Sequence, residues 1–173
     1  MAERRVNREK DEWADRLRIM IDTHQLSLLR LCYLYLHDVQ LAEDAVQETF
    51  IKAWRGLPSF REECSEKTWL TRIALRVCCD IRRGSWFRHV DRRIQPDEMP
   101  ISAVPAKEED RDLTVAVMNL PVKLREAMIL YYYQEMNVNE IARILGITQP
   151  TVSNRLKRGR EKLRRQLTGR EAE

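Results

Sequence analysis

Basic side chains are concentrated between residues 150 and 165. This segment contains seven Lys or Arg residues and one acid, a formal charge of +6, whereas the whole chain carries only +4. The remainder of the chain is therefore net acidic, at −2. Phosphate contacts from a basic surface dominate the binding of proteins to DNA. The clustering indicates a DNA-binding helix, and the alternative is an amphipathic helix whose Lys and Arg simply remain in solvent.

The residues on both sides of Gly146 favour a helix-turn-helix. Ile141, Ile144 and Leu145 recur at helical spacing, and Gly146 suits a left-handed helix C-cap. Thr148 is a suitable N-cap for a second helix. The predicted buried stripe of that second helix consists of Val152, Leu156, Gly159, Leu163 and Leu167. The basic side chains then lie on its other faces.

The motif also predicts which residues read DNA, because side chains near the N-terminus of the second helix reach base edges. The candidates are Thr151, Ser153, Asn154, Arg155 and Arg158. Asn and Arg can form paired hydrogen bonds with adenine and guanine respectively. The remaining candidates lie further along the helix, where phosphates are the expected contacts, and are Lys157, Arg160 and Lys162.

Composition and proline placement predict an all-α chain with two small helical domains. The chain has 173 residues, 43% of them hydrophobic, and only five glycines, and its apolar residues recur with a period near 3.6. Pro96, Pro100 and Pro105 interrupt the pattern. We therefore expect an N-terminal domain at 1–86, a linker at 87–109 and a C-terminal domain at 110–173.

The N-terminal domain is predicted to begin with two helices, one around residues 13–21 and a strongly apolar one at 26–36. A third helix from residue 41 carries Glu43, Asp44 and Glu48 with no base between residues 41 and 50. An acidic face of this kind suits a protein partner better than DNA. The alternative is that Glu43 and Asp44 simply interact favourably with the helix dipole.

A second basic region combines aromatic and cationic residues. Phe60 lies in a polar loop, and Trp69 lies near the start of the helix that follows. Such side chains can stack on the bases of a single strand, although a buried Trp is the alternative explanation. The cations available on this helix are Lys67, Arg72, Arg76, Arg82 and Arg83.

No pattern indicates a catalytic, metal or cofactor site. Cys32, Cys64, Cys78 and Cys79 show no CxxC spacing, and the three histidines form no ligand pattern. We expect neither disulfides nor an enzymatic activity; Cys64 is distinct in lying in a polar loop. No apolar stretch is long enough to span a bilayer, so no membrane insertion is expected and the predicted location is the cytoplasm.

The order of these blocks resembles a known family. The motifs are DAVQETFIKAW at 44–54, F-x-x-x-x-S-x-K-TWL-x-RIA at 60–74, LP-x-x-x-RE at 120–126 and EIARILGITQPTVSNRLKRGREKLR at 140–164. They are similar to those of the extracytoplasmic-function sigma factors of bacterial RNA polymerase. The resemblance implies one domain that grips the polymerase clamp and melts the −10 element. It implies a second domain that docks on the polymerase flap and reads the −35 element.

The resemblance assigns roles to particular residues. Asp44, Gln47 and Glu48 match the helix that contacts core polymerase. The loop at 60–67 matches the segment that captures a base flipped from the −10 element. The −10 DNA-binding set is Phe60, Arg61, Ser65, Lys67, Trp69, Arg72, Arg76, Arg82 and Arg83. The −35 set is Thr151, Ser153, Asn154, Arg155, Lys157, Arg158, Arg160 and Lys162.

Some positions depart from the family pattern. Arg76 stands where relatives often have Asn, and Cys64 lies within the base-capturing loop. Pro150 replaces a frequent Gly, and Ser153 and Asn154 replace a more usual Lys–Ser pair. The promoter sequences that this chain reads therefore do not follow from the family.

The resemblance also implies partners and a form of control. Core RNA polymerase and promoter DNA are the expected partners, and a stress or envelope regulon is the expected target. The two-domain layout leaves little room for built-in autoinhibition, so an anti-sigma factor is expected to control the chain. Two other classes remain open: a helix-turn-helix repressor, which would be a dimer on a palindromic operator, and a helical adaptor that does not touch DNA.

Overall fold

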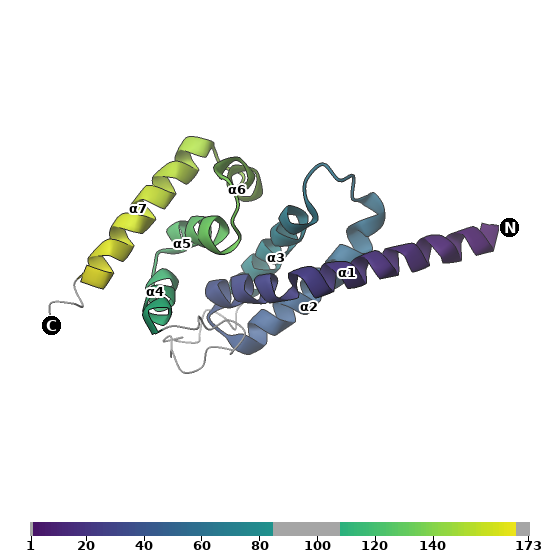
Figure 1. The fold of residues 1–173 in the computed structure, drawn as a ribbon, viewed down its shortest axis with the longest axis horizontal. Coiled ribbons are helices and arrows are strands. Elements are labelled where there is room, and N and C mark those ends of the chain that lie inside the picture. The colour runs from purple at the N-terminus through teal and green to yellow at the C-terminus, as the bar shows by residue number, and fades with distance from the viewer. Residues whose placement is uncertain (1, 85–107, 169–173) are drawn as a thin grey trace.

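The computed structural model describes the backbone of residues 2–84 and 108–168, and the side chains of residues 11–84 and 113–168. Over these residues the chain is all helical, with no strand, as predicted. The helices form an N-terminal unit, α1 to α3, and a C-terminal unit, α4 to α7, which lie side by side (Figure 1). Most of the predicted linker at 87–109, with its three prolines, lies outside the described residues.

The N-terminal unit is built on one long helix. This helix, α1 (Ala2–Leu36), runs without interruption, so the prediction of separate helices at 13–21 and 26–36 is wrong. The physical reason is that the intervening residues 22–25 contain neither Gly nor Pro, and nothing in them interrupts the backbone hydrogen bonds. The C-terminal half of α1 is the core of the unit, with Leu28, Leu31, Leu34 and Leu36 fully buried.

Two further helices pack against α1. Helix α2 (Val39–Gly56) begins at Asp38, whose carboxylate accepts a hydrogen bond from the Leu41 N–H at 2.8 Å. A short 3₁₀ turn, η1 (Leu57–Ser59), and a polar loop lead to α3 (Glu66–Arg83). Ser65 caps α3 by accepting a hydrogen bond from the Thr68 N–H at 3.1 Å. This cap fixes the point at which the loop meets the helix.

The C-terminal unit consists of shorter helices around a smaller core. It contains α4 (Glu108–Met118), α5 (Val122–Met128), the π-helical segment η4 (Ile129–Tyr133), α6 (Val138–Leu145) and α7 (Gln149–Thr168). Leu124, Ile129, Leu130 and Ile141 are buried in this core, and α5 and α6 pack against α7. One continuous cluster of buried apolar residues extends through both units. Helix α1 contacts α4 and η4, and α3 contacts α6.

Candidate nucleic-acid and polymerase interfaces

The turn between α6 and α7 sets the direction of the predicted DNA-reading helix. Helix α6 begins with a capping box: the Asn137 side chain accepts from the Glu140 N–H at 3.0 Å, and the Glu140 carboxylate accepts from the Asn137 N–H at 2.9 Å. It ends at Gly146, whose φ of +64° is the left-handed conformation predicted for this residue. The helix-turn-helix is therefore confirmed.

The apolar stripe of α7 is buried against the rest of the C-terminal unit, as predicted. Val152, Leu156, Gly159 and Leu163 are buried, and Leu167 packs partly against the same core. Gly159 lies where α7 approaches α5, since an added Cβ there would lie 2.9 Å from the Met128 sulfur. A larger residue at position 159 would require the Met128 side chain to shift.

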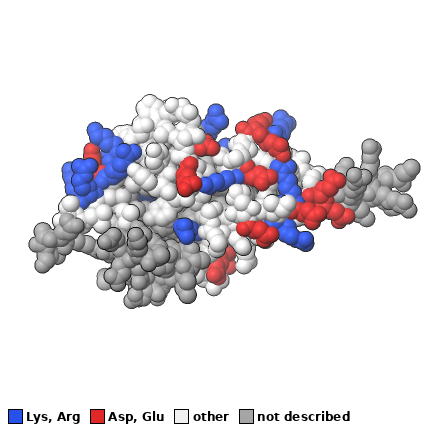
Figure 2. Space-filling model, in the orientation of Figure 1, with Lys and Arg blue, Asp and Glu red and all other residues white. Residues whose placement is uncertain are grey.

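The outward face of α7 carries most of the predicted −35 residues. Those that are exposed are Thr151, Ser153, Asn154, Lys157, Arg158, Arg160 and Lys162. Lys and Arg side chains gather over this helix on the face shown in Figure 2. Arg155 differs, because only 18% of its side chain is exposed and its guanidinium lies 3.8 Å from the Glu126 carboxylate. In this structure Arg155 is thus turned toward the body of the protein.

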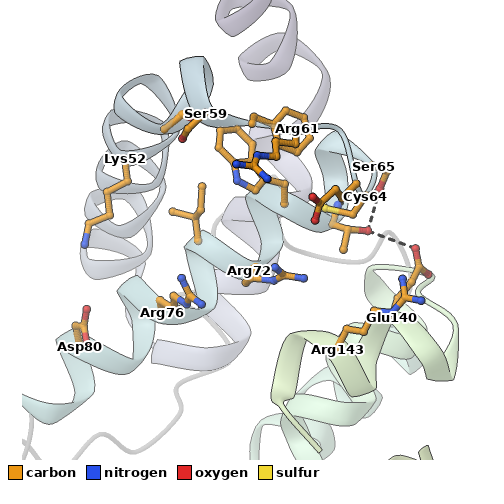
Figure 3. Close-up of a pocket in the computed structure, with 16 residues that line it drawn as sticks. Lys52, Ser59, Arg61, Cys64, Ser65, Arg72, Arg76, Asp80, Glu140 and Arg143 are labelled. Atoms are coloured by element: carbon orange, nitrogen blue, oxygen red, sulfur yellow. Dashed lines mark hydrogen bonds between the residues drawn. The ribbon is translucent and has the colours of Figure 1, made fainter.

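A cavity of about 790 Å³ lies beside the loop and α3, where the −10 residues were predicted (Figure 3). The predicted residues that line it are Phe60, Arg61, Ser65, Trp69, Arg72 and Arg76. Arg72 and Arg76 lie one turn apart on α3 and extend along the cavity (Figure 3). The Arg72 Nε is buried without a hydrogen-bond partner among the described residues. Such an orphaned donor can be satisfied by an incoming acceptor such as a phosphate or a base edge.

An aromatic stack forms part of the cavity lining. The rings of Phe60 and Trp69 have centroids 4.5 Å apart and planes inclined by 19°. Arg16, from α1, places its guanidinium 5.5 Å from the Phe60 centroid. It also forms ion pairs with Glu62 at 2.6 Å and Glu66 at 2.9 Å. These contacts hold the loop against α1, and Glu62 keeps a left-handed φ of +56° beside the cavity.

Three predicted −10 residues do not line the cavity. Lys67 is half-buried at the start of α3, and Arg83 is exposed at the end of that helix. The Arg82 guanidinium lies 5.2 Å from the centre of the Tyr35 ring, at the contact between the two units. The structure therefore brings together six of the nine predicted residues and places the other three outside the cavity.

Other residues that line the cavity were not predicted. Lys52 comes from α2, and Glu140 and Arg143 come from α6 in the C-terminal unit (Figure 3). No local pattern in the sequence could have identified the last two, because they reach the cavity only through the packing of two units distant in the chain. Lys52 lies one turn after Glu48 on α2. The sequence therefore predicted the helical face on which Lys52 lies, but not that this face lines the cavity.

The predicted polymerase-binding residues lie on the outer face of α2. Asp44 and Gln47 are exposed. Glu48 is partly exposed, and its carboxylate forms an ion pair with Lys52 at 3.6 Å. Neither Glu43 nor Asp44 lies in the first turn of α2, which contains no acid, so the helix-dipole explanation does not account for them. Ile51 is 45% exposed and Trp54 is 39% exposed one and two turns further along. An exposed aromatic residue such as Trp54 is typical of a protein-binding surface.

Two of the four cysteines lie in the apolar core of the N-terminal unit. All four are free thiols; Cys32 and Cys78 are buried together in the N-terminal core. A hydrogen bond with Cys32 and burial raise the pKa of the Cys78 thiol far above its ordinary value, so it is not a reactive thiolate. Cys64 is half-buried and lines the cavity.

Within residues 11–84 and 113–168, no group of His, Cys, Asp and Glu is placed to hold a metal ion. No described helix has the length and apolarity needed to cross a membrane.

Comparison with known proteins identifies the family. The Sigma-70 region 2 family matches residues 20–88, and the Sigma-70 region 4 family matches residues 110–163. The chain is 32% identical to the ECF RNA polymerase sigma factor SigW of Bacillus subtilis, covering 96% of this chain and 97% of SigW. The chain belongs to the ECF sigma factors. It is also 33% identical to sigma factor SigM of Mycobacterium tuberculosis, over 83% of this chain and 73% of SigM.

The fold of this sigma factor agrees with solved structures. It matches the sigma factor RpoE of Bartonella quintana, crystallised with the anti-sigma factor NepR, with a TM-score of 0.69 and 25% identity over 91% of this chain and 97% of that one. It also matches the fold of CnrH, solved with the cytosolic domain of CnrY, with a TM-score of 0.68 over 88% of both chains. As a sigma factor, the chain directs RNA polymerase to promoters and is not an enzyme.

Proposed function

We propose that this sigma factor binds the clamp of core RNA polymerase through the outer face of α2. Asp44, Gln47 and Glu48 supply charge and hydrogen-bonding groups, and exposed Ile51 and Trp54 supply apolar area on the same helix. Aromatic residues beside polar groups are enriched at protein interfaces. The complementary surface on the polymerase would be basic around an apolar centre.

The cavity beside α3 would receive the −10 element as a single strand. Phe60 and Trp69 provide a stacking platform for a base that has left the duplex, and Arg72 and Arg76 provide cations for the adjoining phosphates. Because stacking does not depend on base identity, the polar lining must set the preference. Arg76 and Cys64 are the lining residues that set this chain apart from its family pattern.

The C-terminal unit would read the −35 element as duplex. Helix α7 presents Ser153, Asn154 and Arg158 near its N-terminal end for the major groove. A largely apolar cavity of about 600 Å³ lies between α4, η4 and α7, with Arg30 of α1 also in its lining; exposed Leu113 and Tyr132 line it. We assign this apolar region to the polymerase flap.

We also propose an anti-sigma factor as a partner of this chain. The location that we propose for the chain is the bacterial cytoplasm. The support is that a structural neighbour of this chain, RpoE of Bartonella quintana, was crystallised with the anti-sigma factor NepR. The family designation as extracytoplasmic-function factors supports a regulon of stress or envelope genes.

One observation carries this proposal: the chain combines an aromatic and basic cavity beside α3 with an exposed basic helix, α7. A repressor would need only the second. The test is to measure binding of the purified chain to genomic DNA fragments with and without core polymerase, together with its mass in solution. We expect a monomer that retains specific fragments only with polymerase. A dimer that binds a palindrome equally well without polymerase would instead establish a repressor.

A further inference from the structure

The two DNA-reading surfaces are in contact with each other in this structure. The Thr68 hydroxyl, at the start of α3, donates to the Glu140 carboxylate at 3.3 Å across the two units (Figure 3). Arg143, one turn further along α6, lines the same cavity. The first helix of the helix-turn-helix therefore forms one wall of the pocket proposed for the −10 strand. A carboxylate from the C-terminal unit thus lines the same cavity as Arg72 and Arg76, which are proposed to hold phosphates.

A second contact between the units lies at Tyr35 and Glu126, and one predicted DNA-binding residue from each unit lies beside this pair. The Tyr35 hydroxyl, on α1, donates to Glu126 Oε1 at 2.8 Å, and Tyr35 is only 3% exposed. Glu126 Oε2 lies 3.8 Å from the Arg155 guanidinium of α7. On the other side, the Arg82 guanidinium lies 5.2 Å from the centre of the Tyr35 ring. Arg155 of the −35 set and Arg82 of the −10 set are thus both directed toward the Tyr35–Glu126 pair.

This arrangement cannot engage both promoter elements at once. The −10 and −35 positions are about 25 base pairs apart, which corresponds to about 85 Å of duplex. Here the units that would read them are joined by hydrogen bonds between Thr68 and Glu140 and between Tyr35 and Glu126. The units must therefore separate before the chain can act on a promoter.

We propose that the free chain holds itself closed through Glu126 and Glu140, so that each unit covers DNA-binding groups of the other. This inference rests on the proposed roles of the two units. The contacts made by these two carboxylates are polar and exchangeable: Arg155 would leave Glu126 for DNA, and Thr68 would leave Glu140. They lie beside the apolar contact of α1 with α4 and η4, which must also part when the units separate. Polar contacts of this kind between domains are typical of interfaces that open. Control is then built into the chain as well as supplied by a partner, contrary to the expectation from its two-domain layout.

The test uses two substitutions that weaken the contact without removing a proposed DNA-binding residue. Tyr35→Phe removes the hydroxyl that reaches Glu126 and also Cys79 of α3, and Glu126→Gln removes only the charge beside Arg155. Asp22→Asn, at an exposed carboxylate on α1, is the matched control. Small-angle scattering of the free proteins measures whether the units separate, and binding of a labelled oligothymidylate measures whether the pocket becomes accessible.

We expect both variants to have a larger radius of gyration than the wild type, with Asp22→Asn unchanged. Oligothymidylate affinity should rise about fivefold or more, since a ligand binds in proportion to the open population. Variants indistinguishable from the wild type in both measurements, or a wild type that already scatters as an extended chain, would overturn the closed state. Scattering needs neither polymerase nor DNA, so it tests the closed state by itself. A failure of the proposed function would instead appear in transcription assays.

Discussion

The indole of Trp69 stacks on the ring of Phe60, with centroids 4.5 Å apart and planes inclined by 19°. The edge of the indole also packs over α2, where an added Cβ at Gly56 would lie 3.2 Å from it. Two elements besides α3 therefore fix its orientation. An aromatic platform that is ordered before DNA arrives loses little conformational freedom when a base stacks on it.

Loss of the Trp69 ring should impair promoter melting. Trp69→Ala should lower initiation about tenfold or more, because each base–aromatic stack contributes about 1–3 kcal/mol. Trp69→Phe should retain most of the activity. Permanganate reactivity of promoter thymines in the complex with core polymerase measures the melted strand directly. If Trp69→Ala is folded by circular dichroism and melts the promoter as the wild type does, the platform has no role in strand capture.

On α7, Arg158 and Lys162 should behave differently although both are exposed. Arg158→Ala should reduce affinity for the correct −35 duplex by about 1–3 kcal/mol and relax specificity at one base pair. Lys162→Ala should weaken binding to all duplexes alike and reduce the salt dependence by about one ion. Fluorescence anisotropy with polymerase-bound protein at several salt concentrations separates the two effects. Equal loss on every sequence for both variants would show that Arg158 contacts only phosphate.

On α2, Glu48→Lys should impair capture of core polymerase and leave DNA contacts intact. The Glu48–Lys52 pair is exposed, and such surface pairs contribute about 0–1 kcal/mol, so folding should persist. Asp22→Lys makes the same charge change on an exposed position of α1 and serves as the control. Co-purification with core polymerase is the measurement. Equal retention of both variants would place the polymerase contact elsewhere.

Acid should destabilise the N-terminal unit through His24. Burial lowers the pKa of His24 below its ordinary value of 6.5, and nearby Lys67 lowers it further, while Glu66 opposes the shift. The unfolded chain therefore takes up this proton at a higher pH than the folded chain does. Stability from this group is present above about pH 6.5 and falls as the pH drops through the folded pKa.

His24→Gln removes the titrating group and should reduce the loss of stability between pH 7.5 and pH 5.5. Urea denaturation of the two proteins at both pH values measures this difference. An identical pH dependence in the variant would mean that other groups account for the whole effect.

Much of the fold was predictable because its signals are local. Gly146 at a left-handed C-cap and the stripe through Val152, Leu156 and Leu163 follow from helical periodicity and from glycine's backbone freedom. The division of α1 into two helices was wrong because a change in apolar pattern was taken for a break where no helix-breaking residue occurs. Apolar periodicity shows which face of a helix is buried. Whether a helix continues depends instead on whether a residue such as Gly or Pro interrupts its backbone hydrogen bonds.

The site was predictable only where its residues are close in the chain. Phe60, Trp69, Arg72 and Arg76 share one loop and one helix, so the sequence placed them together. Glu140, 72 positions from its partner Thr68, entered the pocket through packing between units, for which the sequence has no local signal. The roles of Arg125 and Glu126 were missed for the same reason, although a charged pair within the apolar stretch LREAMIL was a visible sign. Buried Arg125 lies 2.6 Å from the His37 ring at the end of α1.

As an ECF sigma factor, this chain gives core RNA polymerase its promoter specificity. The most direct measurement maps transcription start sites on fragmented genomic DNA with core polymerase, in the presence and absence of the purified chain. We predict starts that depend on the chain and share a two-part motif, with one block near −10 and one near −35. A set of starts that is the same with and without the chain would mean that it does not direct promoter recognition.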